Sequence, residues 1–332
     1  MKKELGLLAL LIFLCLVVIG VDIGLQLHSG TKLAELEMPR FVTRTNLTNM
    51  ANIIGLFGIF SIGMGLVIIT GGIDLSVGSM FALTGVLLSM ALVEWHWPWP
   101  IAAFMVILIP MALGSGHGFL ITRLNIQPFI VTLCGLLLYR GLARFIAEDT
   151  TKGFGNAKGC ETLANLASGR LWGIPMPFIL LLVVATIMWF VLHRSVYGRY
   201  LLAVGRNEEA ARFSGISTRK VIASSYVVAG LLAGISGILF AFYTNSVSPS
   251  NHGSFYELYG IAAAVLGGCS LRGGEGSIIG IVIGTALLQV LQNLVNLLGI
   301  PSSLNFAVMG AVVLFGVMAE QLMGNRGVAK KP

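Results

Sequence analysis

Long apolar runs, separated by short polar segments, recur along the whole chain. Most runs approach the roughly 20 apolar residues that a helix needs to cross a bilayer. The eighth run is the exception, because it is short and rich in Ala and Gly. The pattern predicts an all-α fold, a polytopic transmembrane helical bundle of about ten spans. The runs are Leu5 to Leu27, Met50 to Thr70, Leu75 to Val93, Pro98 to Leu120, Gln127 to Ala147, Ile174 to Leu192, Val221 to Tyr243, Phe255 to Gly268, Ser277 to Leu298 and Ser303 to Glu320.

Composition supports a lipid environment for most of the chain. Of the 332 residues, 56% are hydrophobic and 11% are charged, whereas soluble domains average about 25% charged residues. Too few charges remain to cover a water-exposed surface. The first run is longer than the apolar core of a signal peptide and no A-x-A cleavage pattern closes it, so we expect a retained span. Four scattered Cys residues indicate no disulfide framework.

Basic residues predict the orientation of the spans. With ten spans and both termini in the cytoplasm, 13 of the 21 Lys and Arg residues lie inside and 8 outside, as the positive-inside rule requires. The same arrangement predicts an external loop at about residues 150–173 and a charged cytoplasmic loop at about 193–220. No linker divides the chain, so residues 1–332 are expected to form a single transmembrane domain.

The segment Gly71 to Ser79, with the sequence GGIDLSVGS, separates the second and third runs. Two Gly residues end one helix, and Asp74 is placed to cap the next one. A charged side chain between two spans is costly unless it is capped, paired or hydrated. A turn with a helix cap is one interpretation, and a functional position near a pathway or a partner contact is the other.

The cytoplasmic loop contains a short predicted helix of its own. Asn207 is placed at the N-cap, and Glu208 and Glu209 lie in the first turn, where the helix dipole favours anions. Two Ala residues follow, and Gly215 is placed to end the helix. Taken alone, these features also fit an ordinary solvated cytoplasmic helix.

Together these segments resemble the membrane permease subunits of bacterial ABC importers of the ribose, xylose and galactose type. GGIDLSVGS resembles the family signature, and Glu209-Ala210-Ala211-x-x-x-Gly215 fits the EAA-type coupling motif. Further similarity lies in Gln127 to Leu133, Arg140-Gly141, Glu257-Leu258, Ile261 to Ala263 and the Gly-rich segment 267–280. Cys134, Tyr259-Gly260 and the segment 251–253 depart from the family pattern, which leaves the sugar open.

The resemblance implies import of a monosaccharide, in particular a pentose such as ribose, across the bacterial cytoplasmic membrane. It also implies several partners: two cytoplasmic ABC ATPase subunits or one fused tandem ATPase, a second permease copy or paralogue, and a periplasmic or extracellular sugar-binding protein. Membrane lipid is a further expected contact, and nucleic acid is not. ATP and Mg would bind the partner ATPase, since this chain has no G-x-x-x-x-G-K-[ST] loop and is expected to bind no cofactor or metal.

The resemblance assigns two groups of site residues. Coupling to the ATPase is expected at Arg206, Asn207, Glu208, Glu209, Ala210, Ala211, Arg212 and Gly215. The family signature, with a pathway or gate role, is expected at Gly71, Gly72, Asp74, Ser76, Gly78, Ser79, Arg140 and Glu257. Arg140 either extends to the lipid headgroups or forms part of an outer gate. His117 is interpreted as a helix-end histidine rather than a ligand.

Two alternatives to sugar import remain at this point. The first is the same type of importer for autoinducer-2, nucleosides or branched-chain amino acids. The second is an ion-coupled secondary transporter, a class that usually places ionisable residues or broken helices at the middle of the membrane. An enzyme is not expected, because no catalytic set of residues is apparent.

Overall fold

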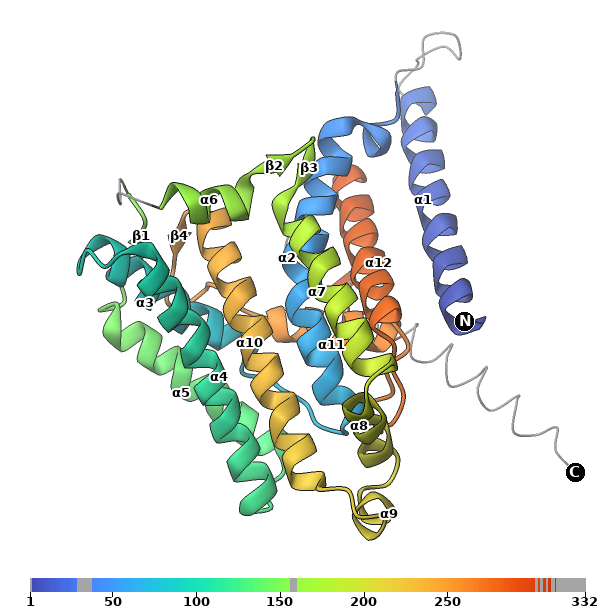
Figure 1. The fold of residues 1–332 in the computed structure, drawn as a ribbon. Helices are drawn as coiled ribbons and strands as arrows, with labels where there is room; N and C mark the ends of the chain where they lie inside the picture. The colour runs from blue at the N-terminus through green and yellow to red at the C-terminus, as the bar shows by residue number, and fades with distance from the viewer. Residues whose placement is uncertain are drawn as a thin grey trace, which may run out of the picture.

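A computed structural model describes residues 2–28, 38–155 and 160–301, and after these only 304, 307, 308, 310, 311 and 314. The regular elements of the described chain are helices, apart from four strands of two residues each (Figure 1). The helices are α1 Lys2–His28, α2 Arg44–Ile69, α3 Val77–Val93, α4 Trp99–Arg123, α5 Pro128–Ile146, α6 Glu161–Ser168, α7 Met176–His193, α8 Val196–Arg206, α9 Glu208–Phe213, α10 Thr218–Thr244, α11 Tyr256–Leu266 and α12 Ile278–Leu297, with a 3-10 helix, η2, at Arg40–Val42.

Seven of these helices are long and apolar enough to cross a membrane, which confirms an all-α polytopic protein. They are α1, α2, α4, α5, α7, α10 and α12. The third and eighth expected spans correspond to the shorter apolar helices α3 and α11. Most of the last expected span, Ser303 to Glu320, lies outside the described residues.

The two central helices are α2 and α10, and the other helices pack around them. Most residues of both helices are buried. Helix α10 packs against α4 and α3, whereas α2 packs against α7, α11 and α12. Helix α1 stands at the edge, along α12 (Figure 1), and the Oγ of Ser277 donates a 2.8 Å hydrogen bond to Glu4 Oε1 near the N-terminal end of α1.

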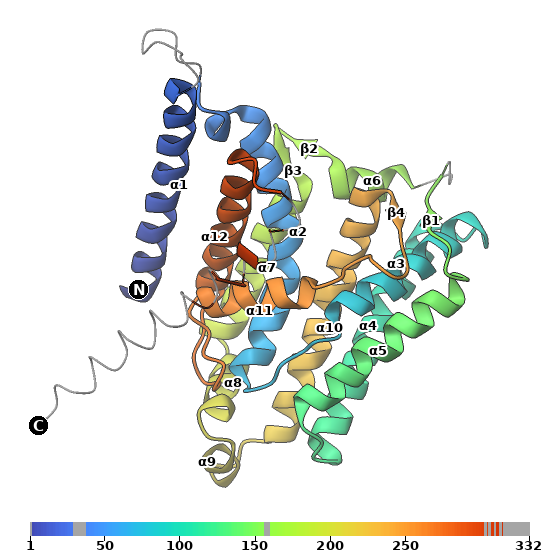
Figure 2. The ribbon, with the colours of Figure 1, turned by 180° about the vertical axis from the view of Figure 1, so that it is seen from behind.

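Helices α3 and α11 are short because a non-helical segment occupies part of the depth that each would otherwise span. Residues 70–76 lead from the end of α2 to α3, and residues 246–255 lead from α10 to α11. Seen from behind, α11 crosses the middle of the bundle (Figure 2). We call residues 70–76 and 246–255 the two interrupted segments, because they interrupt the helical path through the bundle. Non-helical backbone is tolerated at such a depth where it is buried in protein or lines a cavity.

The two ends of the bundle differ in structure. The expected external loop contains α6, and two pairs of short antiparallel strands lie at this end (Figure 1). β1 (Lys152–Gly153) pairs with β4 (Ser246–Val247), and β2 (Arg170–Leu171) pairs with β3 (Ile174–Pro175). The expected cytoplasmic loop at the opposite end folds into α8 and α9, so it carries one helix more than the sequence predicted.

Candidate functional site

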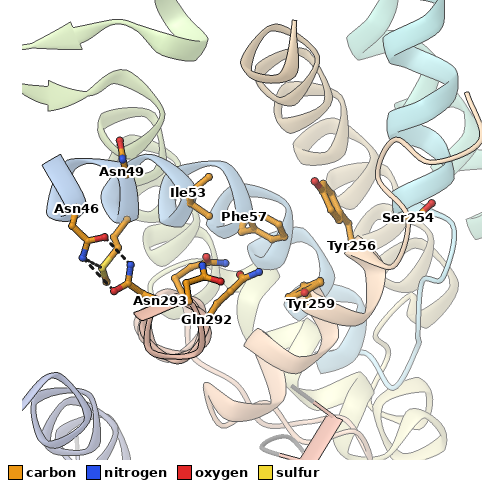
Figure 3. Close-up of a pocket in the computed structure, with 12 residues that line it drawn as sticks. Asn46, Asn49, Ile53, Phe57, Ser254, Tyr256, Tyr259, Gln292 and Asn293 are labelled. Atoms are coloured by element: carbon orange, nitrogen blue, oxygen red, sulfur yellow. Dashed lines mark hydrogen bonds between the residues drawn. The ribbon is translucent and has the colours of Figure 1, made fainter. Parts of the chain in front are cut away.

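A polar cavity of about 480 Å³ opens between α2, α11 and α12 (Figure 3). We call it the amide pocket, since six of the side chains around it are Asn or Gln. Its volume falls within the range of roughly 300–1,000 Å³ typical of small-molecule sites. The lining residues are Asn46, Asn49, Met50, Ile53, Phe57, Ser254, Tyr256, Tyr259, Gln289, Gln292, Asn293 and Asn296.

The amides come from single faces of two long helices. Positions 289, 292, 293 and 296 of α12 follow the i, i+3, i+4, i+7 spacing that places side chains on one helical face. Asn46 and Asn49 do the same on α2. Asn46 Nδ2 donates to Asn293 Oδ1 at 3.2 Å, and Asn293 Nδ2 donates back to Asn46 Oδ1 at 2.7 Å. This reciprocal pair joins the two helices at one edge of the pocket (Figure 3).

Aromatic rings form the opposite side of the amide pocket. The ring centroid of Phe57 lies 4.9 Å from that of Tyr256 and 5.5 Å from that of Tyr259. Behind them, Phe60 and Phe240 continue the same cluster into the core, with Phe240 4.9 Å from Tyr256. The rings provide flat apolar surface next to the amides (Figure 3).

The chemistry of the amide pocket is polar and uncharged. Its twelve lining residues include no Asp, Glu, Lys, Arg or His. Each amide carries both donors and an acceptor, and a hydroxyl group can satisfy either. The side chains of Gln292 and Asn296 make no hydrogen bond to another residue of the described chain, so their polar atoms are available to a solute. The arrangement suits a neutral ligand with several hydroxyl groups better than a zwitterion or an ion.

The sequence analysis missed this pocket. The available signal was the row of four amides inside the apolar run that became α12, together with the Asn residues at the start of α2. None of the eight residues expected at the pathway or gate lines the amide pocket, so their role in a pathway stays a prediction.

The signature segment connects the end of α2 to the start of α3 inside the bundle. Asp74 is 1% exposed, and its Oδ1 accepts hydrogen bonds from Ser76 N at 2.9 Å and Ser76 Oγ at 2.6 Å. Ser76, not Asp74, occupies the N-cap position of α3. The expected helix cap at Asp74 is therefore wrong, because its carboxylate stabilises the turn before the helix. Ser79 continues this local network by donating to Ser76 O at 2.7 Å.

Side chains of helix α5 donate hydrogen bonds to both interrupted segments. Thr132 Oγ1 donates to Ile73 O at 3.1 Å, within residues 70–76. Two helical turns later, Arg140 Nη1 donates to Pro249 O at 3.2 Å and to His252 O at 2.7 Å, within residues 246–255. Arg140 therefore does not extend to lipid headgroups. Its guanidinium satisfies carbonyl groups that the non-helical segment leaves without helical partners.

The N-terminal ends of α3 and α11 also meet directly. A methyl group at Gly78 would overlap Gly253 O and Glu257 Oε2, so only Gly allows this close approach. Glu257 is 7% exposed and lies in the first turn of α11. The structure therefore brings Gly78, Arg140 and Glu257 together around the segment that leads into α11.

Helices α8 and α9 form a hairpin at one end of the molecule (Figure 1), and we call it the coupling hairpin. Asn207 Oδ1 accepts a 2.9 Å hydrogen bond from Ala210 N, which confirms the predicted N-cap of α9. Gly215 has a φ of +83°, a conformation that favours glycine and ends the helix. Ala211 is buried and anchors the helix, whereas Arg206, Asn207, Glu208, Glu209, Ala210 and Arg212 are exposed.

One further residue of the coupling hairpin was not expected from the sequence. The side chain of Phe213 is 82% exposed at the end of α9. Glu209 and Phe213 are four residues apart, so they share one helical face. Exposed aromatic rings are typical of surfaces that contact another protein.

The coupling hairpin contacts the end of α2 and the segment that precedes α12. A methyl group at Gly205 would overlap Ile69 O, at the end of α2, and the N–H of Gly274, which precedes α12. Gly274 N itself donates to Ile69 O at 2.8 Å. Arg206 packs on Gly274. One backbone junction thus joins α8, α2 and the segment before α12.

His117 occupies a different environment from the one expected. It lies six residues before the end of α4, is 2% exposed and has its Nε2 2.7 Å from the hydroxyl oxygen of Tyr139. It is therefore a buried histidine held between helices, not a helix-end residue.

These features define a polytopic membrane protein with an uncharged polar pocket and a surface hairpin at one end. Residues 46–317 match the family described as the permease component of the branched-chain amino acid transport system, and the chain belongs to this family. Together with the seven long apolar helices, this makes the chain a multi-pass protein of the inner membrane.

Similar proteins are permeases of sugar import. The chain is 38% identical to the ribose import permease protein RbsC of Escherichia coli K12, over 85% of this chain and 87% of that protein. It is 37% identical to RbsC of Bacillus subtilis 168, over 85% and 87% of the two chains. The D-allose transport system permease protein AlsC of E. coli K12 is 30% identical, over 85% of each chain. No solved structure matches the chain.

Proposed function

We propose that this chain is the permease subunit of an ABC importer for a monosaccharide, a pentose such as ribose. The observation that carries the proposal is the amide pocket, which offers donors, acceptors and aromatic faces without a charged group. The names of the relatives support the same solute class. The family name mentions branched-chain amino acids, but an amino acid zwitterion would leave both its charges unpaired in this pocket.

The mechanism follows from the two helices that the pocket and the coupling hairpin share. Helix α2 contributes Asn46 to the pocket and ends at Ile69 beside Gly205, while α12 begins after Gly274 and contributes Gln292. Packed helices move as rigid bodies. A displacement of the hairpin by a cytoplasmic ATPase therefore shifts both walls of the pocket, which changes its opening and its hydrogen-bonding geometry together.

The partners in this proposal are an ATPase that holds the exposed face of α9, a second permease and a sugar-binding protein that delivers the solute. ATP and Mg bind the ATPase. We further propose ten spans, with both termini in the cytoplasm. The seven long helices are completed by two spans that contain the short helices α3 and α11, and by the run Ser303 to Glu320.

Reconstitution tests the function. Proteoliposomes with this chain, its ATPase and its binding protein should take up labelled ribose only when ATP is supplied inside. Uptake that proceeds equally without the ATPase contradicts the proposal. Uptake that a protonophore abolishes while ATP depletion leaves it unchanged would instead identify an ion-coupled secondary transporter.

Labelling of single cysteines tests the topology. In a variant without native cysteines, Ser214→Cys in the coupling hairpin should react with an impermeant maleimide only from the cytoplasmic side. Asn165→Cys in α6, which is exposed at the opposite end, should react only from outside. Labelling of both positions from one side contradicts the orientation.

A further inference from the structure

A second cavity, of about 690 Å³, lies where α4 ends, α10 begins and α9 passes beside them. We call it the basic pocket. Arg123 comes from the last turn of α4, Arg212 from α9, and Arg219 and Lys220 from the first turn of α10. Glu208 is the only carboxylate in the lining. Four cations from three helices thus converge on one cavity.

In the described chain these cations form no ion pair, neither with Glu208 nor with another carboxylate. Within the part of the chain that the structure describes, Arg123, Arg219 and Lys220 form no ion pair and no side-chain hydrogen bond. Arg212 only stacks over the ring of Phe213, at 5.7 Å. Arg219 and Lys220 moreover occupy the positive end of the dipole of α10, where cations are unfavourable. An anion in the cavity would relieve this repulsion.

Part of the remaining wall of the basic pocket is apolar, beside polar residues at 115, 122, 125, 217 and 218. Phe119 of α4 is 58% exposed, and Ile222 and Ala223 of α10 are only partly buried. These residues lie on the two membrane-spanning helices, one turn or less inward from the cations. A free phosphate or other soluble anion would not use this apolar wall, whereas a phospholipid has acyl chains next to its charged headgroup.

The basic pocket includes two of the residues expected to contact the ATPase but leaves the face of α9 with Glu209 and Phe213 free of the cavity. Glu208 and Arg212 are four residues apart and line the pocket, whereas Glu209 and Phe213 do not. The short helix α9 therefore presents one face to the cavity and a second face to the cytoplasm. A ligand in the cavity contacts α9 without covering Glu209 or Phe213.

We propose that the basic pocket binds the phosphate headgroup of an anionic phospholipid, with its acyl chains along Phe119. Basic pockets between spanning helices on the cytoplasmic side are suited to such headgroups. The bound lipid connects α4, α9 and α10, and it holds the coupling hairpin at the level of the membrane surface. This goes beyond the proposed function, and binding can be measured without transport.

Native mass spectrometry of the full-length permease in detergent tests the proposal, with phosphatidylglycerol and phosphatidylcholine titrated separately. The wild type should bind phosphatidylglycerol roughly tenfold more tightly, since each cation near the headgroup adds to the attraction. Arg219→Gln with Lys220→Gln should remove this preference. The control double variant Arg40→Gln with Arg199→Gln removes two exposed cations outside the pocket and should retain it.

Several outcomes would overturn the proposal. Equal binding of the two lipids by the wild type, or an equal loss in both double variants, would show that the pocket does not select the headgroup. Displacement of the lipid by soluble glycerol phosphate at similar concentrations would indicate a free-anion site. If the first double variant misfolds by circular dichroism, Arg123→Gln alone replaces it, with an expected partial loss of preference and Arg199→Gln as its control.

Discussion

The amide pocket and the coupling hairpin use opposite kinds of polarity. The pocket is built from neutral amides and aromatic rings between α2, α11 and α12, and no charged side chain lines it. The hairpin is short, exposed and charged, with Glu209 and Phe213 on its outer face. In the proposed importer, the difference means that a solute is recognised by hydrogen bonds in a cavity, whereas the partner is recognised by charge and exposed apolar surface.

The comparison also shows how two such different regions can act together. The pocket is lined by side chains of α2 and α12, and the hairpin makes backbone contacts to the opposite end of α2 and to the segment before α12. Substitutions in one region should therefore leave the other folded while they interrupt transport. The predictions below separate the two regions, from the largest expected effect to the smallest.

The largest effect is expected from Glu209→Lys in the coupling hairpin. Reversal of an exposed charge at a partner surface places like charges together, and uptake in proteoliposomes should fall on the order of 100-fold. Binding of solute in the amide pocket should not change. The measurements are ATP-driven uptake of ribose and ATP hydrolysis by the partner, and hydrolysis should persist without transport.

Glu161→Lys is the matched control for this charge reversal. Glu161 is exposed in the first turn of α6, as Glu209 is in α9, but it lies at the opposite end of the bundle. The variant Glu161→Lys should therefore leave ATP-driven uptake of ribose unchanged. Wild-type uptake by Glu209→Lys, or an equal loss in both variants, would contradict the assignment of the hairpin.

The second effect concerns the amide pocket. Gln292→Leu keeps the approximate volume but removes donor and acceptor atoms, so a bound hydroxyl loses its partner and uptake should fall roughly tenfold. Gln292→Glu should reduce uptake of a neutral sugar as well, because it introduces a charge. Gln127→Leu, an exposed amide outside the pocket, should have no effect.

The measurement for these variants is the KM for ribose at saturating ATP, with basal ATP hydrolysis as the second readout. A raised KM with normal basal hydrolysis supports solute binding in the pocket. Normal uptake by Gln292→Leu would show that the solute does not use this cavity.

The sequence predicted the elements with strong local signals. The long apolar runs became spanning helices because each satisfies its own backbone in lipid, and Asn207 and Gly215 define the ends of α9 through short-range rules. Residues whose function depends on contacts between distant segments were not predictable in this way. Helix α8 was not predicted for a different reason. Its polar and apolar residues are interspersed, so it contains no long apolar run.

Arg140 and Asp74 illustrate the limit. Their sequence positions indicated that each needs a partner, but not which one. Arg140 binds carbonyl groups more than 100 residues away, and Asp74 binds a serine two residues away instead of capping the helix. The amide pocket depends on two helices about 250 residues apart in the chain, as the Asn46–Asn293 pair shows. One sequence contains no direct record of such pairings.

The third effect is on residues 246–255, the segment that leads into α11 and contributes Ser254 to the amide pocket. Arg140→Gln removes the charged donor that holds Pro249 O and His252 O, and the free energy of unfolding should fall by about 2 kcal/mol. Arg144→Gln is the control on the same helix, because Arg144 pairs only with Asp149 at an exposed position. Thermal unfolding in detergent measures both. An equal shift in the two variants would contradict the proposed contact.

The smallest effect isolates a single hydrogen bond between helix α5 and the signature segment. Thr132 Oγ1 reaches Ile73 O as well as Pro128 O in its own helix, whereas Thr186 Oγ1 bonds only to Leu182 O in its own helix. Thr132→Val and Thr186→Val therefore lose the same intrahelical bond, and only the first also loses a contact to residues 70–76. The difference between their free energies of unfolding should be about 1 kcal/mol. If the two variants unfold at the same temperature, α5 does not stabilise the signature segment through this hydrogen bond.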